Sequence, residues 1–133
     1  MSHWTKVTVE IREREKLKKV LKKLGLNYQE GMSAKLKMKG YAGNTAMVDM
    51  TIDFGKPRSS DYKVGLNFNV ETGKTEVIAD WWGLQTTQEK FTEEVVAPYA
   101  EEVAVSQMIS EGYLVADRQQ TSEGVAITLV EPL

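Results

Sequence analysis

Alternation between apolar and polar positions dominates this chain and predicts mainly β-strands. In residues 3–11, Val7, Val9 and Ile11 share one side, which is typical of a half-buried strand. The same period of two recurs in later segments, several of them separated by short turns that contain glycine. These further predicted strands are 35–39, 46–54, 62–68, 75–81, 113–119 and 124–130.

Two stretches have helical spacing instead. The first, residues 12–24, carries aliphatic residues at i, i+3, i+4 and i+7, namely Leu17, Val20, Leu21 and Leu24. The second runs over residues 86–112 and begins near Thr86, because Glu89 three residues later completes a capping box. Pro98 lies inside this stretch and predicts a kink or two abutting helical pieces.

The predicted order of elements is β-α-β-β-β-β-α-β-β, which indicates the α+β class. Strands joined by short turns favour a mostly antiparallel sheet, with the two amphipathic helices packed on one face. A chain of 133 residues is long enough for one domain, residues 1–133, with its own core. The other face of the sheet is expected to be open and to carry the charged residues Lys35, Lys37, Lys39, Asp49 and Asp53.

Composition narrows the class of protein. Apolar residues make up 41% and charged residues 27% of the chain, which is ordinary for a soluble globular protein. The chain has no cysteine, so disulfides and thiolate chemistry are excluded. It begins without an apolar signal core, and no apolar run approaches the roughly 18 residues that span a bilayer. We therefore expect a soluble cytoplasmic protein with no membrane segment.

Charge is distributed unevenly along the chain. The net charge is -2, yet the first 40 residues carry 11 Lys/Arg and 4 Asp/Glu, and the rest carry 6 and 15. The predicted first helix holds a basic cluster of Lys18, Lys19, Lys22 and Lys23. Such a face is usually solvated or faces an acidic protein. Binding of single-stranded nucleic acid is an alternative, less favoured because the protein is acidic overall and no aromatics interleave with the lysines.

The segment Ala79 to Gly83 places two tryptophans beside an acid at the end of a predicted strand. Alternation along this strand sends Trp81 into the core and leaves Trp82 at least partly exposed. The pair can act as a lid on the core, and the outward ring can also anchor a partner. The candidate partner-binding residues are Trp82, Asp80, Trp4, Tyr41 and the four lysines of the first helix.

Chemistry beyond binding has little support in the sequence. His3 is the one histidine, and without cysteines it does not make a metal site. Residues 40–44 are rich in glycine but lie between strands, which indicates a turn and not a phosphate loop. We predict no metal, no cofactor and no catalytic residues. A small-molecule enzyme is the remaining alternative, and it would need Asp80 to lie in a pocket.

Several short motifs, in this order and spacing, resemble a known family over nearly the whole chain. They are residues 1–6, Leu17 to Lys19 with Leu24-Gly25, Gly40 to Gly43, Val77 to Gly83, Tyr99-Ala100 and Glu111 to Tyr113. The chain is similar to the hypothetical-chloroplast-reading-frame proteins, the thirty-fifth of that series, of cyanobacteria and algal plastids, with bacterial and phage relatives. It differs from their pattern at Pro98, in the Lys56 to Ser60 loop and in the end at residues 131–133.

The resemblance implies a protein of uncharacterised biochemical role and no established enzymatic activity. It also implies an accessory role beside other proteins, because the genes of relatives lie near those of an AAA-class ATPase and a small ferredoxin-type protein. For a plastid-encoded relative, the corresponding compartment would be the plastid stroma. The resulting hypothesis is a non-enzymatic accessory or adaptor protein that binds other proteins.

Overall fold

The computed structural model describes residues 4–40, 43–121 and 124–131. The chain divides into two compact units, residues 1–99 and 100–133, which are described separately. The prediction that residues 1–133 form a single domain stays a prediction. In the described part of the chain, no helix is both long enough and apolar enough to cross a membrane.

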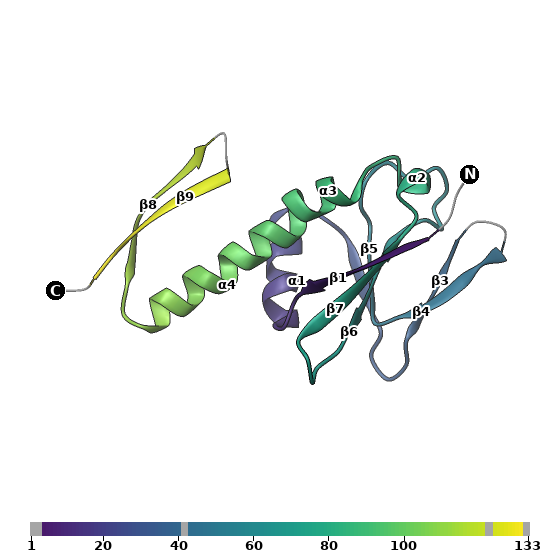
Figure 1. Ribbon diagram of the computed structural model, residues 1–133, viewed down its shortest axis with the longest axis horizontal. Helices are drawn as coiled ribbons and strands as arrows, with labels where there is room; N and C mark the ends of the chain where they lie inside the picture. Colours follow the sequence, from purple (N-terminus) through teal and green to yellow (C-terminus); the bar gives the residue numbers. More distant parts are fainter. Residues whose placement is uncertain (1–3, 41–42, 122–123, 132–133) are drawn as a thin grey trace. The chain divides into compact units, whose positions relative to one another are not determined.

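The first unit is built on a five-stranded antiparallel sheet with the strand order β1-β7-β6-β5-β2 (Figure 1). Its strands are β1 (Thr5–Glu10), β2 (Tyr28–Glu30), β5 (Met50–Ile52), β6 (Val64–Phe68) and β7 (Lys74–Ala79). The core lies along the three central strands, where Met50, Leu66 and Val77 are fully buried. Strand β2 was not predicted, because three residues are too short to show an alternating pattern.

A separate two-stranded sheet belongs to the same unit and consists of β3 (Leu36–Lys39) and β4 (Thr45–Val48). The predicted strand 46–54 is therefore divided between two sheets, and Asp49 marks the division. Its backbone N–H donates to the carbonyl of Leu66 over 2.9 Å, and its carboxylate accepts from the N–H of Phe68 over 2.9 Å. Hydrogen bonds to the neighbouring strand thus bend the chain at a residue that alternation alone assigns to a continuous strand.

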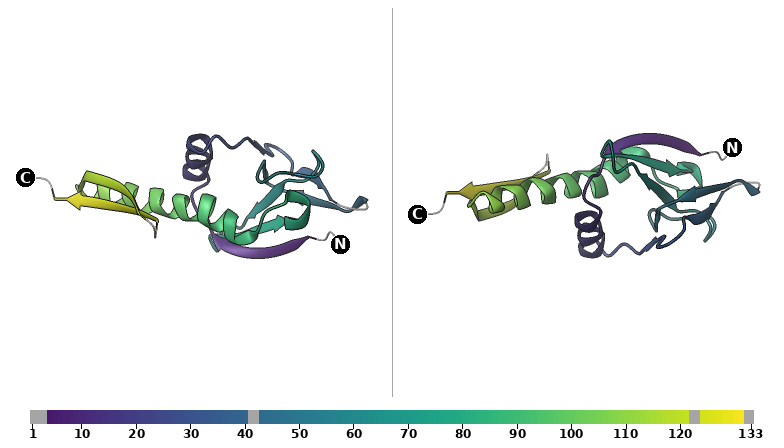
Figure 2. Two further views of the ribbon diagram at one scale, coloured as in Figure 1. Left: turned by 90° about the horizontal axis from the view of Figure 1, so that it is seen from above. Right: turned by 90° about the horizontal axis from the view of Figure 1, so that it is seen from below.

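Helix α1 (Arg14–Lys23) lies on one side of the five-stranded sheet, as both views of Figure 2 show. Leu17, Val20 and Leu21 are buried, as predicted. Leu24 was expected on the same stripe but is 43% exposed, because the helix ends at Lys23. The helix also starts two residues later than predicted. The N–H groups of the two preceding residues donate to the Tyr99 hydroxyl, each over 3.0 Å.

The second helical region is divided into α2 (Trp81–Leu84), α3 (Gln88–Phe91), the π-helical turn η2 (Thr92–Val96) and α4 (Ala97–Ser110). The capping residue is Thr87 and not Thr86, since the Thr87 hydroxyl accepts from the N–H of Lys90 over 3.1 Å. The interruption predicted at Pro98 takes the form of the π-helical turn immediately before it. A proline lacks the N–H that the α-helical pattern needs, and a wider turn accommodates that loss.

The second unit contains the rest of α4 and a hairpin of β8 (Leu114–Thr121) and β9 (Gly124–Val130). The two strands pair antiparallel and form a sheet of their own, with a bulge between Val115 and Asp117. This hairpin was predicted within one or two residues at each end. The α+β class and the order of strands and helices are confirmed, with β2 and the division of residues 46–54 as the additions.

Candidate partner-binding surface

Asp80 turns the chain from strand β7 into the short helix α2. Strand β7 ends at Ala79, two residues before the predicted end at Trp81, because Asp80 is the N-cap of α2. Its Oδ1 accepts the N–H of Gly83 over 2.9 Å, which satisfies a donor that the first helical turn leaves open. Asp80 is only 2% exposed, so its placement on a surface for partners is wrong. Its role here is to fix the direction of α2.

A loop over residues 55–60 covers the carbonyl end of α2. The N–H of Lys56 donates to the carbonyl of Leu84 over 2.8 Å, and the N–H of Arg58 donates to that of Gly83 over 2.7 Å. The side chain of Gln85 donates back to the Lys56 carbonyl over 2.8 Å. A helix of four residues has no stability of its own. Here the cap at its start and the loop at its end hold it in one position.

Trp82 projects from this fixed turn and is 48% exposed. The Arg58 guanidinium lies 4.1 Å from the centre of the Trp82 ring, within the range of a cation–π contact. The Nε of Arg58 also donates a hydrogen bond to the Trp82 carbonyl over 3.0 Å. Stacking and hydrogen bonding therefore hold the guanidinium in place beside an accessible indole. We call these two residues the Trp82–Arg58 pair.

Trp81 points the other way, into the first unit. Its ring lies 5.9 Å from that of Phe91, which in turn meets Phe54 edge to face at 5.2 Å. The predicted division holds in direction, since Trp81 faces inward and Trp82 is exposed, but Trp81 is half-buried and not fully buried, and the reason for the division differs. The two tryptophans are consecutive residues of a helical turn, about 100° apart, and not alternating residues of a strand.

Gly83 completes the turn because the Tyr62 ring lies directly against it. A Cβ atom at this position would be 2.8 Å from the Cδ1 of Tyr62, which is closer than van der Waals contact allows. Any other residue would push Tyr62 away from α2. The sequence signal for this feature is the Trp-Trp-Gly triplet itself, whereas Tyr62 and Arg58 come from an earlier loop that is distant in the sequence.

Trp4, another aromatic candidate, does not join this surface. Trp4 is half-buried and packs against a small cluster of Met38, Val48 and Ile78. Its ring lies over Gly40, where a Cβ would be 2.5 Å from the Trp4 Cζ2. It therefore fastens the β3–β4 hairpin to the main sheet. Tyr41 and His3 lie outside the described residues.

The basic helix is only partly an open positive surface. Lys18 bridges Glu15 on the same helix and Glu30 on strand β2, each over 3.1 Å, and Arg14 approaches Glu30 at 3.4 Å. The hydrogen bond from Lys18 lowers the pKa of Glu30, and those to Glu15 and Glu30 raise the pKa of Lys18. Lys19 and Lys23 also make interactions, and Lys22 is exposed.

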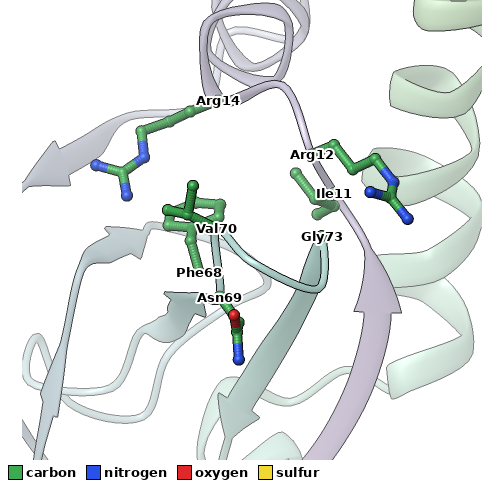
Figure 3. A pocket seen from close by; sticks show the side chains of 7 residues that line it. All are labelled: Ile11, Arg12, Arg14, Phe68, Asn69, Val70 and Gly73. Atoms are coloured by element: carbon green, nitrogen blue, oxygen red, sulfur yellow. The ribbon is translucent and has the colours of Figure 1, made fainter.

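A pocket of about 240 Å³ lies where α1 begins beside the β6–β7 turn (Figure 3). Its lining combines apolar and basic side chains: Ile11, Arg12, Arg14, Phe68, Asn69, Val70 and Gly73. The two arginines point away from each other, on opposite sides of the pocket, so they do not converge on a shared anion. Two other pockets, of about 200 and 360 Å³, are lined by different residues, and none of the three includes Asp80.

The structure thus defines an α+β protein with an ordered, exposed Trp–Arg pair. Within the described ranges, no group of three or more acidic, histidine or cysteine residues could hold a metal ion. The chain belongs to DUF1257, a family of proteins of unknown function, whose family model matches residues 20–130. This finding confirms the predicted family resemblance.

A relative supports the same assignment. The chain is 27% identical over 126 residues to the uncharacterized protein ycf35 of Cyanophora paradoxa. The alignment covers 93% of this chain and 91% of the relative. No solved structure matches the chain.

Proposed function

We propose that this protein is a non-enzymatic accessory or adaptor protein that binds a protein partner through the Trp82–Arg58 pair. The observation that carries the proposal is the half-exposed Trp82 ring held against the Arg58 guanidinium. Tryptophan and arginine are the residue types most enriched among those that dominate binding energy at protein interfaces. A partner that covers this ring would gain the free energy of removing its apolar surface from water.

A second argument is that Trp82 and Arg58 are already held in position before any partner binds. The backbone of α2 is capped by Asp80 and covered by the loop that carries Arg58. The Arg58 guanidinium is already bonded to the Trp82 carbonyl. A partner would therefore meet side chains that lose little conformational freedom on binding, and this lowers the entropic cost of association.

Two competing functions fit the same residues less well. A nucleic-acid binder would use the basic helix, but Lys18 is already paired with two glutamates. An enzyme built on Asp80 would need this carboxylate in a pocket, whereas Asp80 is buried as a helix cap. We therefore also propose that this protein has no catalytic activity. Its proposed location is the cytoplasm or, if it is plastid-encoded, the plastid stroma. An AAA-class ATPase and a ferredoxin-type protein are the first partners to test.

The test compares matched variants against purified candidate partners and against native-host extract. Trp82→Ala and Arg58→Ala alter the Trp82–Arg58 pair. Met32→Ala is the matched control, because it removes an apolar side chain elsewhere that is even more exposed than Trp82. We expect Trp82→Ala to weaken partner binding by about 30-fold, equivalent to about 2 kcal/mol, because central anchors of this type carry such energies. Met32→Ala should bind as the wild type does.

Circular dichroism serves as the folding control for each variant. Quantitative mass spectrometry of captured proteins, followed by calorimetry with the purified partner, gives the readout. A partner that binds the wild type and the Trp82→Ala variant with equal affinity would contradict the proposed surface. Turnover of a small molecule that depends on Asp80 would contradict the non-enzymatic assignment.

A further inference from the structure

Strand β9 combines an open edge with an uncharged sequence. It pairs with β8 on one side, and because the sheet has two strands, the backbone N–H and C=O groups on its other side have no strand partner. Its seven residues, Gly124–Val130, include no charged side chain and no proline. Charges, prolines and bulges are the usual devices that keep an edge strand from pairing with another chain.

The other edge strands of the described chain have such protection. Strand β1 carries Lys6 and Glu10, and β3 carries two lysines. Strands β2 and β4 are only three and four residues long. On the hairpin itself, β8 has Asp117 and Arg118 and a bulge after Val115. Among the described strands of five or more residues, β9 is the one that lies at an edge without a charge.

The hairpin is also too small to bury its own apolar residues. Leu114, Val115 and Val130 are exposed, and Ile127 and Leu129 are only half-buried. An isolated two-stranded hairpin is marginal in water, and three or more strands are needed for independent stability. The second unit therefore has both an apolar surface to cover and an edge on which to add a strand.

We propose that the hairpin of a second copy of this chain occupies this edge, with β9 paired antiparallel to β9 of the second copy in a four-stranded sheet. A strand without charges opposes no like charges when it faces its own copy, so self-pairing meets no electrostatic penalty. Full overlap of the seven residues places the two-fold axis at Ile127. In that register, Ala126 lies opposite Thr128 of the second copy.

The first test measures the oligomeric state of the full-length protein by sedimentation velocity and light scattering. The double variant Ala126→Lys/Thr128→Lys changes two exposed positions of β9. In the proposed dimer, each new lysine would lie directly opposite a lysine of the second copy. We expect a wild-type dimer whose dissociation constant rises at least about tenfold in this variant, since like charges directly opposite each other destabilise a strand pair. The matched control Ala116→Lys/Gln119→Lys adds the same charge to exposed positions of β8 and should leave the dimer intact.

The second test determines the register. The chain has no cysteine, so single-cysteine variants report unambiguously. Ile127→Cys should form a disulfide with its own copy, and a mixture of Ala126→Cys and Thr128→Cys should form the mixed disulfide in preference to either homodimer. A wild-type monomer at all concentrations would overturn the proposal. A dimer that tolerates the β9 lysines as well as the β8 lysines, or that cross-links without these preferences, would also overturn it.

Discussion

Strands β6 and β9 have similar compositions and opposite environments. Both are uncharged and rich in aliphatic residues. In β6, Val64 and Leu66 are fully buried because the strand has β5 on one side and β7 on the other. In β9, the residues from Ala126 to Val130 are exposed or half-buried, and one side of the strand is unpaired. The second unit thus places a strand with the composition of a central strand at an edge.

This difference shows that neighbours, and not composition, determine how much a strand contributes to stability. A buried aliphatic side chain stabilises the fold through removal from water and through close packing. The same side chain on a two-stranded hairpin gains a fraction of that burial. Substitutions that are identical in chemistry should therefore have different consequences in the two units.

The largest expected loss of stability comes from comparing one leucine-to-alanine substitution in each unit. Leu66→Ala removes a fully buried side chain of β6, and Leu114→Ala removes one of β8 that is 56% exposed. We expect Leu66→Ala to lower the free energy of unfolding by about 2 to 5 kcal/mol, whereas an exposed leucine should cost under about 1 kcal/mol. Urea denaturation followed by circular dichroism gives both values. Equal losses would mean that the hairpin is as well packed as the sheet.

The two neighbouring tryptophans allow a similar comparison within the first unit. Trp81→Ala removes a ring that packs on Phe91, and Trp82→Ala removes the exposed ring. We expect a loss of about 3 kcal/mol for Trp81→Ala and of no more than about 1 kcal/mol for Trp82→Ala. Thermal and urea denaturation of both variants measure the difference. If both changes destabilise the fold equally, Trp82 is a structural residue and the proposed surface loses its anchor.

Local patterns in the sequence were sufficient to predict most of this fold. The alternation of Val7 and Val9, the spacing of Leu17, Val20 and Leu21, and the glycine-containing turns each specify an element from adjacent residues. The family resemblance rested on short motifs of the same local kind. The α+β class follows from these elements and their order.

The features that were missed depend on contacts between residues distant in the sequence. Asp49 bends its strand through bonds to Leu66 and Phe68, on the neighbouring strand. Strand β2 exists because it pairs with β5. No local pattern indicates either contact, since both arise only when the sheet assembles.

The candidate site was predicted only in part for the same reason. Exposure of Trp82 followed from the sequence, although the assumed strand was in fact a helical turn. Burial of Asp80 did not follow, because an acid before two aromatics has the appearance of a surface residue. Arg58, 24 positions from Trp82, was not a candidate at all. A cation–π pair between a loop and a distant turn has no signature in either segment.

Two helix caps, one buried and one exposed, should differ by a smaller amount in what they contribute to stability. Asp80 caps α2 from a buried position, and Thr87 caps α3 from an exposed one. We expect Asp80→Ala to cost about 1 to 2 kcal/mol and Thr87→Ala about 0.5 to 1 kcal/mol, because water can replace the lost acceptor only at the exposed cap. Denaturation with urea measures both. A larger loss at Thr87 would show that burial of the cap adds nothing to its strength.

The smallest expected effect concerns the protected edge strand β2, the counterpart of the unprotected β9. Glu30 on β2 is paired with Lys18 and Arg14, and the hydrogen bond from Lys18 lowers its pKa below the usual 4.5. A carboxylate with a lowered pKa in the folded state stabilises the fold above its unfolded pKa and loses this contribution as the pH falls through the folded value. Glu30→Gln should therefore cost at most about 1 kcal/mol near neutral pH, as is usual for solvent-screened ion pairs.

The pH dependence separates this electrostatic effect from a change in packing. The stability difference between the wild type and Glu30→Gln should be constant from neutral pH down to about pH 5, and it should shrink steadily below the ordinary pKa of a glutamate. Urea denaturation at a series of pH values follows this difference. Glu71→Gln, an exposed glutamate in the β6–β7 turn, is the matched control and should show little change at any pH. A difference for Glu30→Gln that grows as the pH falls would contradict the assigned sign, and the ion pairs of Glu30 would then not be the source of its contribution to stability.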